Sequence, residues 1–172
     1  MKELILGGNR SGKSAYAEQR AIQTTLPVTY IATATAGDAD MAARIAKHQA
    51  RRLQNWALIE EPIHLARTLE IHAHPNRCLL IDCLTLWLCN LLCTETEPSI
   101  ALMRERDALL TLLPSLPGSI IFVANEVGMG IIPQGELSRR FADEAGELNQ
   151  AVAALCERVT LVMAGLPLAL KG

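Results

Sequence analysis

Short apolar runs alternate along the chain with longer stretches in which apolar residues recur at helical spacing. The short runs predict strands at residues 3–6, 28–33, 78–81, 118–124 and 159–164, with a short edge strand at 166–170. The longer stretches predict helices from Gly12 or Lys13 to Gln23 and at residues 38–53, 63–73, 84–93, 100–113 and 136–156. Because the strands are apolar on both faces, the pattern predicts an open, mostly parallel α/β sheet flanked by helices.

Size, charge and cysteine content narrow the class of protein. The 172 residues fit a single domain, residues 1–172, and the formal charge of −2 gives no general attraction to nucleic acid or to an anionic membrane. No apolar run reaches the roughly 18 residues that span a bilayer, and the first residues lack a signal-peptide cleavage site. We therefore expect a cytoplasmic protein that is not an integral membrane protein. The five cysteines, an odd number lying mostly in apolar segments, favour buried thiols over a disulfide framework.

A glycine-rich loop joins the first predicted strand to the first predicted helix. It consists of Gly7, Gly8, Asn9, Arg10, Ser11, Gly12, Lys13 and Ser14, which satisfy the pattern Gly-x4-Gly-Lys-Ser in full. In a P-loop the backbone N–H groups and the helix N-terminus bind phosphates. Lys13 should then reach the β- and γ-phosphates of ATP or GTP, and the Ser14 hydroxyl should ligate Mg²⁺. An ordinary glycine-rich turn is the alternative, but the strand-to-helix context favours the P-loop.

Asp82 comes directly after the third predicted strand. P-loop enzymes place at this point the carboxylate that orients Mg²⁺ or its water, so Asp82 and Ser14 are the candidate Mg²⁺ ligands. The alternative is that Asp82 caps the helix that follows it. Ligands of open α/β sheets bind beyond the carboxyl ends of the strands, so we expect Gly7, Thr33 and Asn125 to converge on one cleft with Asp82.

The predicted helix at 38–53 has one basic face. Its members fall at i, i+3, i+4, i+7 and i+8, and they are Arg44, Lys47, His48, Arg51 and Arg52. An imidazole flanked by cations could attack a nucleotide phosphate, with His48 as the nucleophile. From the spacing alone, a solvated charged face that carries an incidental histidine is the simpler interpretation.

Five segments together resemble one enzyme family. They are the loop at 7–14, Tyr-Ile-Ala-Thr at 30–33, Met-Ala-Ala-Arg-Ile at 41–45 with His48, Trp56 with Glu60, and Asn-Glu-Val-Gly-Met-Gly-Ile-Ile-Pro at 125–133. Over nearly its whole length the chain is similar to the bifunctional adenosylcobinamide kinase/adenosylcobinamide-phosphate guanylyltransferases of cobalamin biosynthesis. Many proteins share the P-loop, whereas the Asn-Glu-Val-Gly-Met-Gly run and the Arg-Ile-x-x-His pattern are specific to this family.

The resemblance implies two reactions in succession. Adenosylcobinamide is phosphorylated with ATP or GTP. GMP from GTP is then transferred to adenosylcobinamide phosphate through a covalent GMP-histidine, which gives adenosylcobinamide-GDP and pyrophosphate. His48 stands at the position of that histidine, and Lys13 and Asp82 of the P-loop site are the other catalytic candidates. The resemblance also implies a RecA-like sheet and a homotrimer.

The resemblance further implies which residues contact the nucleotide. Besides the P-loop, these positions fall on Ala32, Thr33, Ala34, Gln49, Ala50, Arg51, Arg52, Glu60 and Asp82. Asn125 and Glu126 are predicted to shape the corrinoid or phosphate site. The sequence departs from the family in two places: Leu53 follows the last basic residue of the helix where a proline is common, and Lys47 stands where some relatives carry a second histidine.

Two other functions stay open at this point. A P-loop kinase for another small alcohol or nucleotide would need the loop and Asp82 but no covalent histidine. A nucleotide-binding switch or assembly module would bind nucleotide tightly and show no corrinoid-dependent turnover.

Overall fold

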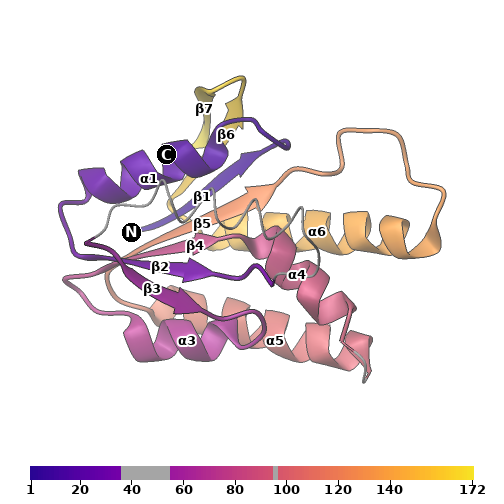
Figure 1. The fold of residues 1–172 in the computed structure, drawn as a ribbon, viewed down its shortest axis with the longest axis horizontal. Coiled ribbons are helices and arrows are strands. Elements are labelled where there is room, and N and C mark those ends of the chain that lie inside the picture. Colours follow the sequence, from indigo (N-terminus) through magenta and orange to yellow (C-terminus); the bar gives the residue numbers. More distant parts are fainter. Residues whose placement is uncertain (36–54, 95–96) are drawn as a thin grey trace.

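The computed structural model describes residues 1–35, 55–94 and 97–172, and the strands of this part of the chain form one sheet (Figure 1). The strands are β1 (Lys2–Gly7), β2 (Val28–Ala32), β3 (Ala57–Glu60), β4 (Cys78–Asp82), β5 (Ser119–Asn125), β6 (Arg158–Met163) and β7 (Leu166–Lys171). Their order across the sheet is β3-β2-β4-β5-β1-β6-β7. All neighbours are parallel except β7, which runs antiparallel to β6. The predicted mostly parallel sheet is therefore confirmed.

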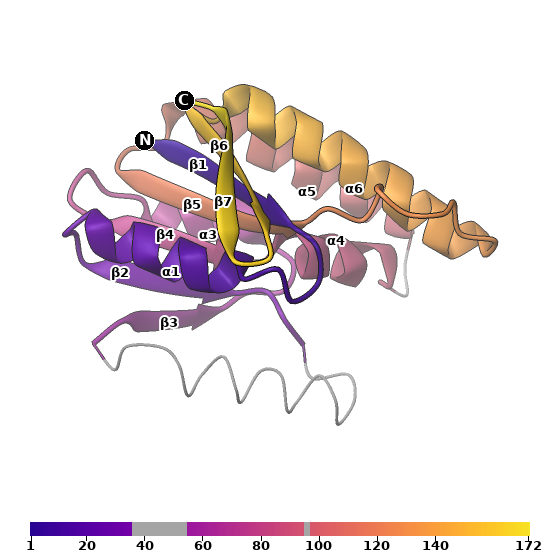
Figure 2. The same ribbon diagram turned by 90° about the horizontal axis from the view of Figure 1, so that it is seen from above.

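Helices cover both faces of the sheet (Figure 2). They are α1 (Lys13–Gln23), α3 (Leu65–His72), α4 (Leu84–Leu92), α5 (Pro98–Leu112) and α6 (Glu136–Leu155), with a 3₁₀ turn at Leu113–Ser115. α1 contacts β1, β4, β5 and β6 on one face. On the other face α4 and α6 contact the sheet, and α5 packs against α3, α4 and α6. Within the described residues no helix is long and apolar enough to cross a membrane.

Alternate residues of each central strand contribute to two different hydrophobic cores. In β1, Leu4 and Leu6 belong to the core beneath α3 to α6, whereas Ile5 belongs to the core beneath α1. In β5, Phe122 belongs to the first core and Val123 to the second. Because successive side chains of a strand point to opposite faces, a strand covered on both sides must be apolar throughout. This burial explains the continuous apolar runs from which the strands were predicted.

Most predicted elements are confirmed to within two residues at each end, with two differences. β3 was not predicted, because its apolar run at 56–59 is short and its residues Ala57–Glu60 lie at the sheet edge and are largely exposed. α5 begins at Pro98, two residues before its predicted start, since proline is tolerated in the first turn of a helix. The predicted helix at 38–53 lies outside the described residues. The single domain over residues 1–172 stays a prediction.

The cysteines follow the expectation of buried thiols in part. Cys78, Cys83 and Cys156 are buried, whereas Cys89 is half-buried and Cys93 is exposed. Burial raises the pKa of Cys83 and that of Cys156 to about 12, so both are neutral thiols near pH 7.

The carboxyl ends of β2, β4, β5 and β1 form the floor of the candidate site. Ala32 lies opposite Asp82, and Gly7 lies opposite Asn125. The Thr33 N–H donates to the Asp82 carbonyl oxygen at 3.3 Å. The convergence of these strand ends at one edge of the sheet is therefore confirmed. β5 lies between β4 and β1, so Asp82 and the P-loop are not on adjacent strands.

Candidate functional site

The P-loop packs closely against β6 and the β6–β7 turn. A Cβ added to Gly7 would lie 2.6 Å from the carbonyl oxygen of Val162 and would also collide with the Ser11 hydroxyl. Gly12 has a φ of 96°, in the left-handed region, and a Cβ there would lie 3.1 Å from Gly165 Cα. The Gly165 N–H donates to the Ser11 carbonyl oxygen at 2.8 Å. Two motif glycines are thus required by the close approach of the loop to its neighbours.

Replacing Gly7 by alanine is expected to lower the free energy of unfolding by about 1–3 kcal/mol, because the new methyl group overpacks a site bounded by backbone. Gly8 provides the matched control, since no atom lies within 4 Å of a Cβ added there. Urea denaturation of Gly7→Ala and Gly8→Ala measures the difference. Equal stability of the two variants would contradict the packing of Gly7 against β6.

The loop itself carries polar groups that can bind phosphate. The Lys13 ammonium donates to the Gly8 carbonyl oxygen at 3.2 Å. Burial lowers the pKa of Lys13, and the nearby Asp82 carboxylate partly offsets this effect. The Ser11 Oγ is buried and has no hydrogen-bond partner in the part of the chain that the structure describes. A buried hydroxyl without a partner costs free energy, and a phosphate oxygen would accept its hydrogen bond.

Asp82 is held at the end of β4 by a buried phenol. The Tyr30 hydroxyl donates to Asp82 Oδ2 at 2.9 Å. Burial, followed by the charge of Asp82, raises the pKa of Tyr30 above its ordinary value, so the phenol stays protonated and acts as the donor. The N-cap residue of α4 is Cys83, whose Sγ accepts from the Leu86 N–H at 3.5 Å. The alternative interpretation of Asp82 as the helix cap is therefore wrong.

Tyr30→Phe removes the phenol oxygen and keeps the ring. Because the Asp82 carboxylate loses one of the groups that orient it, kcat for the phosphoryl transfer that the resemblance implies is expected to fall by about 3- to 10-fold. The free energy of unfolding should change by no more than about 1.5 kcal/mol. Tyr16→Phe, on α1, is the matched control and should leave kcat unchanged. An unaltered kcat in Tyr30→Phe, measured at saturating nucleotide, would show that the phenol does not orient Asp82.

The predicted nucleotide contacts after β2 lie next to the predicted contact on β3. Thr33 is fully buried, and its Oγ1 donates to the Cys83 carbonyl oxygen at 2.7 Å and accepts from the Cys83 N–H at 2.8 Å. Ala32 and Ala34 are half-buried at the same edge. Glu60 ends β3 opposite Ala32 and is exposed. The structure thus pairs Ala32 with Glu60, and Thr33, between Ala32 and Ala34, holds the start of this loop against Cys83.

Other predicted site residues lie outside the described part of the chain. They are His48, Gln49, Ala50, Arg51 and Arg52, together with the cations Arg44 and Lys47. The described chain stops at Thr35, three residues after β2, and resumes at Asn55, two residues before β3. The roles of these residues stay predictions.

Ser14 and Asp82 provide oxygen ligands that fit Mg²⁺. Ser14 lies in the first turn of α1, one residue after Lys13, and both Ser14 and Asp82 are half-buried. Among residues 1–35, 55–94 and 97–172, no group of three or more His, Cys, Asp or Glu side chains could hold a metal ion. In nucleotide sites Mg²⁺ is bound by one or two protein oxygens while phosphates and water supply the others. The donor set therefore suits a magnesium–nucleotide complex.

Hydrogen bonds with residues of two helices hold the backbone of Asn125 in place. The sequence did not predict these contacts. Its N–H donates to Thr85 Oγ1 at 2.6 Å, and its carbonyl oxygen accepts from Asn149 Nδ2 at 3.2 Å. The Asn125 Oδ1 is buried and has no partner within the described residues. Beside it, the Glu126 carboxylate accepts from the Gly128 N–H at 2.8 Å. Thr85 and Asn149 are single polar residues on helices, and their sequence signal is too weak to show that they anchor this strand end.

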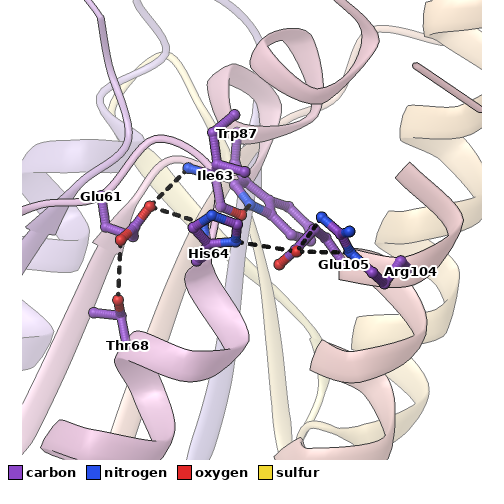
Figure 3. Close-up of polar contacts among 7 residues, drawn as sticks. All are labelled: Glu61, Ile63, His64, Thr68, Trp87, Arg104 and Glu105. Atoms are coloured by element: carbon purple, nitrogen blue, oxygen red, sulfur yellow. Dashed lines mark hydrogen bonds and ion pairs between the residues drawn. The ribbon is translucent and has the colours of Figure 1, made fainter. Parts of the chain in front are cut away.

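A cavity of about 510 Å³ between α3 and α5 is separate from this site. His64 Nδ1 lies 3.1 Å from Glu105 Oε1, and Arg104 donates to the same oxygen at 3.1 Å (Figure 3). The His64 side chain is 57% exposed, whereas its acidic partner Glu105 is 9% exposed. None of the predicted site residues within the described ranges lines this cavity.

Residues 3–170 match the family model described as cobinamide kinase / cobinamide phosphate guanyltransferase. The chain belongs to this family. The predicted family and enzyme class are therefore confirmed, as is the coarser prediction of a bifunctional cobinamide kinase and guanyltransferase. The match spans β1 to β7 and so includes the P-loop, Asp82 and the strand end at Asn125.

Relatives of this cobinamide kinase / cobinamide phosphate guanyltransferase carry names from the same pathway. The "Bifunctional adenosylcobalamin biosynthesis protein CobP" of Pseudomonas aeruginosa is 58% identical over 172 residues, covering 100% of this chain and 98% of its own length. The "Bifunctional adenosylcobalamin biosynthesis protein CobU" of Escherichia coli is 36% identical, over 99% of this chain and 100% of its own length. The protein of that name from Salmonella typhimurium is also 36% identical.

A solved structure with little sequence similarity shares the fold. A protein from Pyrococcus horikoshii OT3 aligns with a TM-score of 0.57 at 8% identity, covering 99% of this chain and 86% of its own. The RadB recombinase aligns over 93% of this chain and 73% of its own, at 12% identity and a TM-score of 0.49. With the strand order, the first of these supports the predicted class of α/β sheet flanked by helices.

Proposed function

We propose that this family member phosphorylates adenosylcobinamide and then guanylylates the product, in the assembly of the cobalamin nucleotide loop. The observation that carries the proposal is a P-loop packed closely against β6 and the β6–β7 turn, in a chain that matches the bifunctional family over residues 3–170. Burial lowers the pKa of Lys13 and the Asp82 carboxylate acts in the opposite direction, and phosphate-transfer sites of this class combine such a lysine with such a carboxylate. The P-loop accounts for the binding and transfer of phosphate, and membership of the family indicates the class of substrate.

In the first reaction, the phosphates of ATP or GTP bind on the loop between β1 and α1. Lys13 neutralises charge on the β- and γ-phosphates, and the Ser11 hydroxyl donates to a phosphate oxygen. The hydroxyl oxygen of the aminopropanol group attacks the γ-phosphorus, and the bond to the nucleoside diphosphate breaks. The hydroxyl proton is lost to water. Asn125 and Glu126, at the end of β5, help to shape the corrinoid or phosphate site.

In the second reaction, a neutral imidazole nitrogen of His48 attacks the α-phosphorus of GTP and pyrophosphate leaves. A phosphate oxygen of adenosylcobinamide phosphate then attacks the phosphorus of GMP-His48, the N–P bond breaks, and adenosylcobinamide-GDP forms. Ala32 and Glu60 support this role, because they lie opposite each other at the carboxyl edge of the sheet, where the chain leaves β2 through Ala34 toward the segment containing His48. Further nucleotide contacts come from Gln49, Ala50, Arg51 and Arg52.

Ser14 and Asp82 would hold Mg²⁺ when the metal–nucleotide complex is bound. The ion would supply positive charge to the phosphate oxygens as the leaving group departs. Tyr30 keeps the Asp82 carboxylate oriented for this contact.

We also propose a homotrimer that acts in the cytoplasm, where its nucleotide substrates are available, with no nucleic-acid partner. The edge strand β7 supports association, because Leu166, Leu168 and Leu170 are all more than half exposed. These three side chains alternate along the strand and therefore share one face, which another copy of the chain would cover.

A time course of products tests the proposed function. The protein is incubated with adenosylcobinamide, Mg²⁺, ATP and GTP, and the corrinoids are identified by liquid chromatography and mass spectrometry. Adenosylcobinamide phosphate should appear first and adenosylcobinamide-GDP second, with one pyrophosphate released for each molecule of the second product. With ATP alone the reaction should stop at the phosphate. Absence of any corrinoid product from nucleotide-binding protein would refute the assignment.

A further inference from the structure

Asn90 is a polar residue on a helix built almost entirely of apolar side chains. α4 reads LTLWLCNLL, and six of its residues are buried. The Asn90 Nδ2 donates to the Thr33 carbonyl oxygen at 2.7 Å and to the Pro62 carbonyl oxygen at 3.1 Å. Its Oδ1 accepts from Thr35 Oγ1 at 3.3 Å. Both amide hydrogens and the amide oxygen are therefore engaged by two different loops.

These two loops carry or adjoin predicted nucleotide contacts. Thr33 and Thr35 follow β2, in the loop that also contains Ala34 and leads to the segment of His48. Pro62 comes two residues after Glu60, the last residue of β3. β3 is an edge strand, and within the described residues it pairs with β2 alone. Its position relative to the rest of the site therefore depends on contacts at its ends.

The chain after β3 is also fixed to its surroundings, as Figure 3 shows. The Glu61 carboxylate accepts from the N–H groups of Ile63 and His64, at 2.9 and 2.7 Å, and lies 3.4 Å from Thr68 Oγ1. Trp87 on α4 donates through its indole nitrogen to the Ile63 carbonyl oxygen at 2.7 Å. These contacts hold the turn itself but do not reach the loop after β2. Within the described residues, the Asn90 amide donates to carbonyl groups of both loops.

We propose that Asn90 is a positioning residue for guanylyl transfer, whose amide fixes the spacing between the loop after β2 and the end of β3. Asn90 does not touch the reacting atoms. It acts through Ala34 and Glu60, and its loss should lower the productive binding of GTP for transfer to His48. The inference rests on the proposed function. Phosphoryl transfer from ATP depends instead on the P-loop, Lys13 and Asp82, which Asn90 does not contact.

Two substitutions test this role. Asn90→Asp keeps the shape but places a carboxylate against two carbonyl oxygens, so both donated hydrogen bonds are lost. Asn90→Ser keeps one short donor. Asn76→Asp, in the exposed turn before β4, controls for the added negative charge. The measurements are kcat/KM for GTP in formation of the protein–GMP adduct, kcat for phosphorylation with ATP, and the midpoint of thermal unfolding.

Asn90→Asp is expected to lower kcat/KM for adduct formation by about tenfold or more, mainly through KM for GTP. The reason is that loss of the two donated hydrogen bonds misplaces the bound substrate. Kinase kcat should stay within about threefold of the native value. For adduct formation, kcat/KM of Asn90→Ser should lie between the values of the native protein and of Asn90→Asp. Equal losses in both reactions with a lower unfolding midpoint would show a purely structural role, and unchanged values would also overturn the inference. If Asn90→Asp does not fold, the same measurements on Asn90→Ser test the inference. Failure of the proposed function itself would appear as no adduct in the native protein.

Discussion

Replacing His48 by alanine is expected to abolish guanylyl transfer while adenosylcobinamide is still phosphorylated with ATP. Without an imidazole no covalent GMP–protein can form, and removal of a nucleophile lowers such rates by about a thousandfold or more. Kinase kcat should remain within about threefold, because it depends on groups of β1, α1 and β4 rather than on His48. Chromatography of the corrinoid products measures both rates in one reaction.

The sequence around His48 makes the result of this substitution straightforward to interpret. Lys47 stands where some relatives carry a second histidine, so a neighbouring imidazole cannot replace the lost one. His74→Ala, in the exposed turn before β4, is the matched control and should leave both rates unchanged. Guanylyl transfer at more than a tenth of the native rate in His48→Ala would refute the role of His48 as the nucleophile.

Replacing Lys13 by alanine should have the largest effect on the kinase reaction. The half-buried ammonium is the cation that the loop directs to the β- and γ-phosphates, and removing such a group lowers kcat by about 100- to 1000-fold. Lys2→Ala removes an ammonium at the opposite end of β1 and should leave kcat unchanged. A loss of less than about threefold in Lys13→Ala would mean that the loop does not bind the transferred phosphate.

The alkaline pH dependence of nucleotide binding provides a second test of Lys13. Burial lowers the pKa of Lys13 below its ordinary value of 10.5 in the free protein. The positive charge is therefore lost at a lower pH than for an exposed lysine, and nucleotide affinity should fall there. The Lys13→Ala variant should not show this fall, which equilibrium titration with a fluorescent nucleotide can measure.

The fold was largely predictable because its central strands are buried on both faces. The runs around Leu4, Leu80 and Phe122 contribute to two cores at once, so their apolar pattern is continuous and strong. β3 was missed because an edge strand is exposed on much of its surface and carries mixed polarity. The position of β5 between β4 and β1 could not be read from the sequence, since strand order is set by tertiary packing.

The phosphate site was more predictable than its supporting contacts. The P-loop motif combines spacing with a strand-to-helix junction, and each part of it has a direct physical reason. These hydrogen bonds of Tyr30, Thr33 and Asn90 join residues 50 or more positions apart, and no local pattern reveals them. Asn90 did leave one signal, as a lone amide in an apolar helix, which the sequence analysis did not use.

Trapping of the covalent intermediate tests the central claim most directly. Native protein is incubated with Mg²⁺ and GTP labelled with ³²P at the α- or the γ-phosphorus, denatured, separated by electrophoresis, and digested for peptide mapping. We predict acid-labile label from α-labelled GTP on the peptide that contains His48, and none from γ-labelled GTP. If protein that binds nucleotide takes up no α-label, or carries it on a peptide without His48, the account of guanylyl transfer is contradicted.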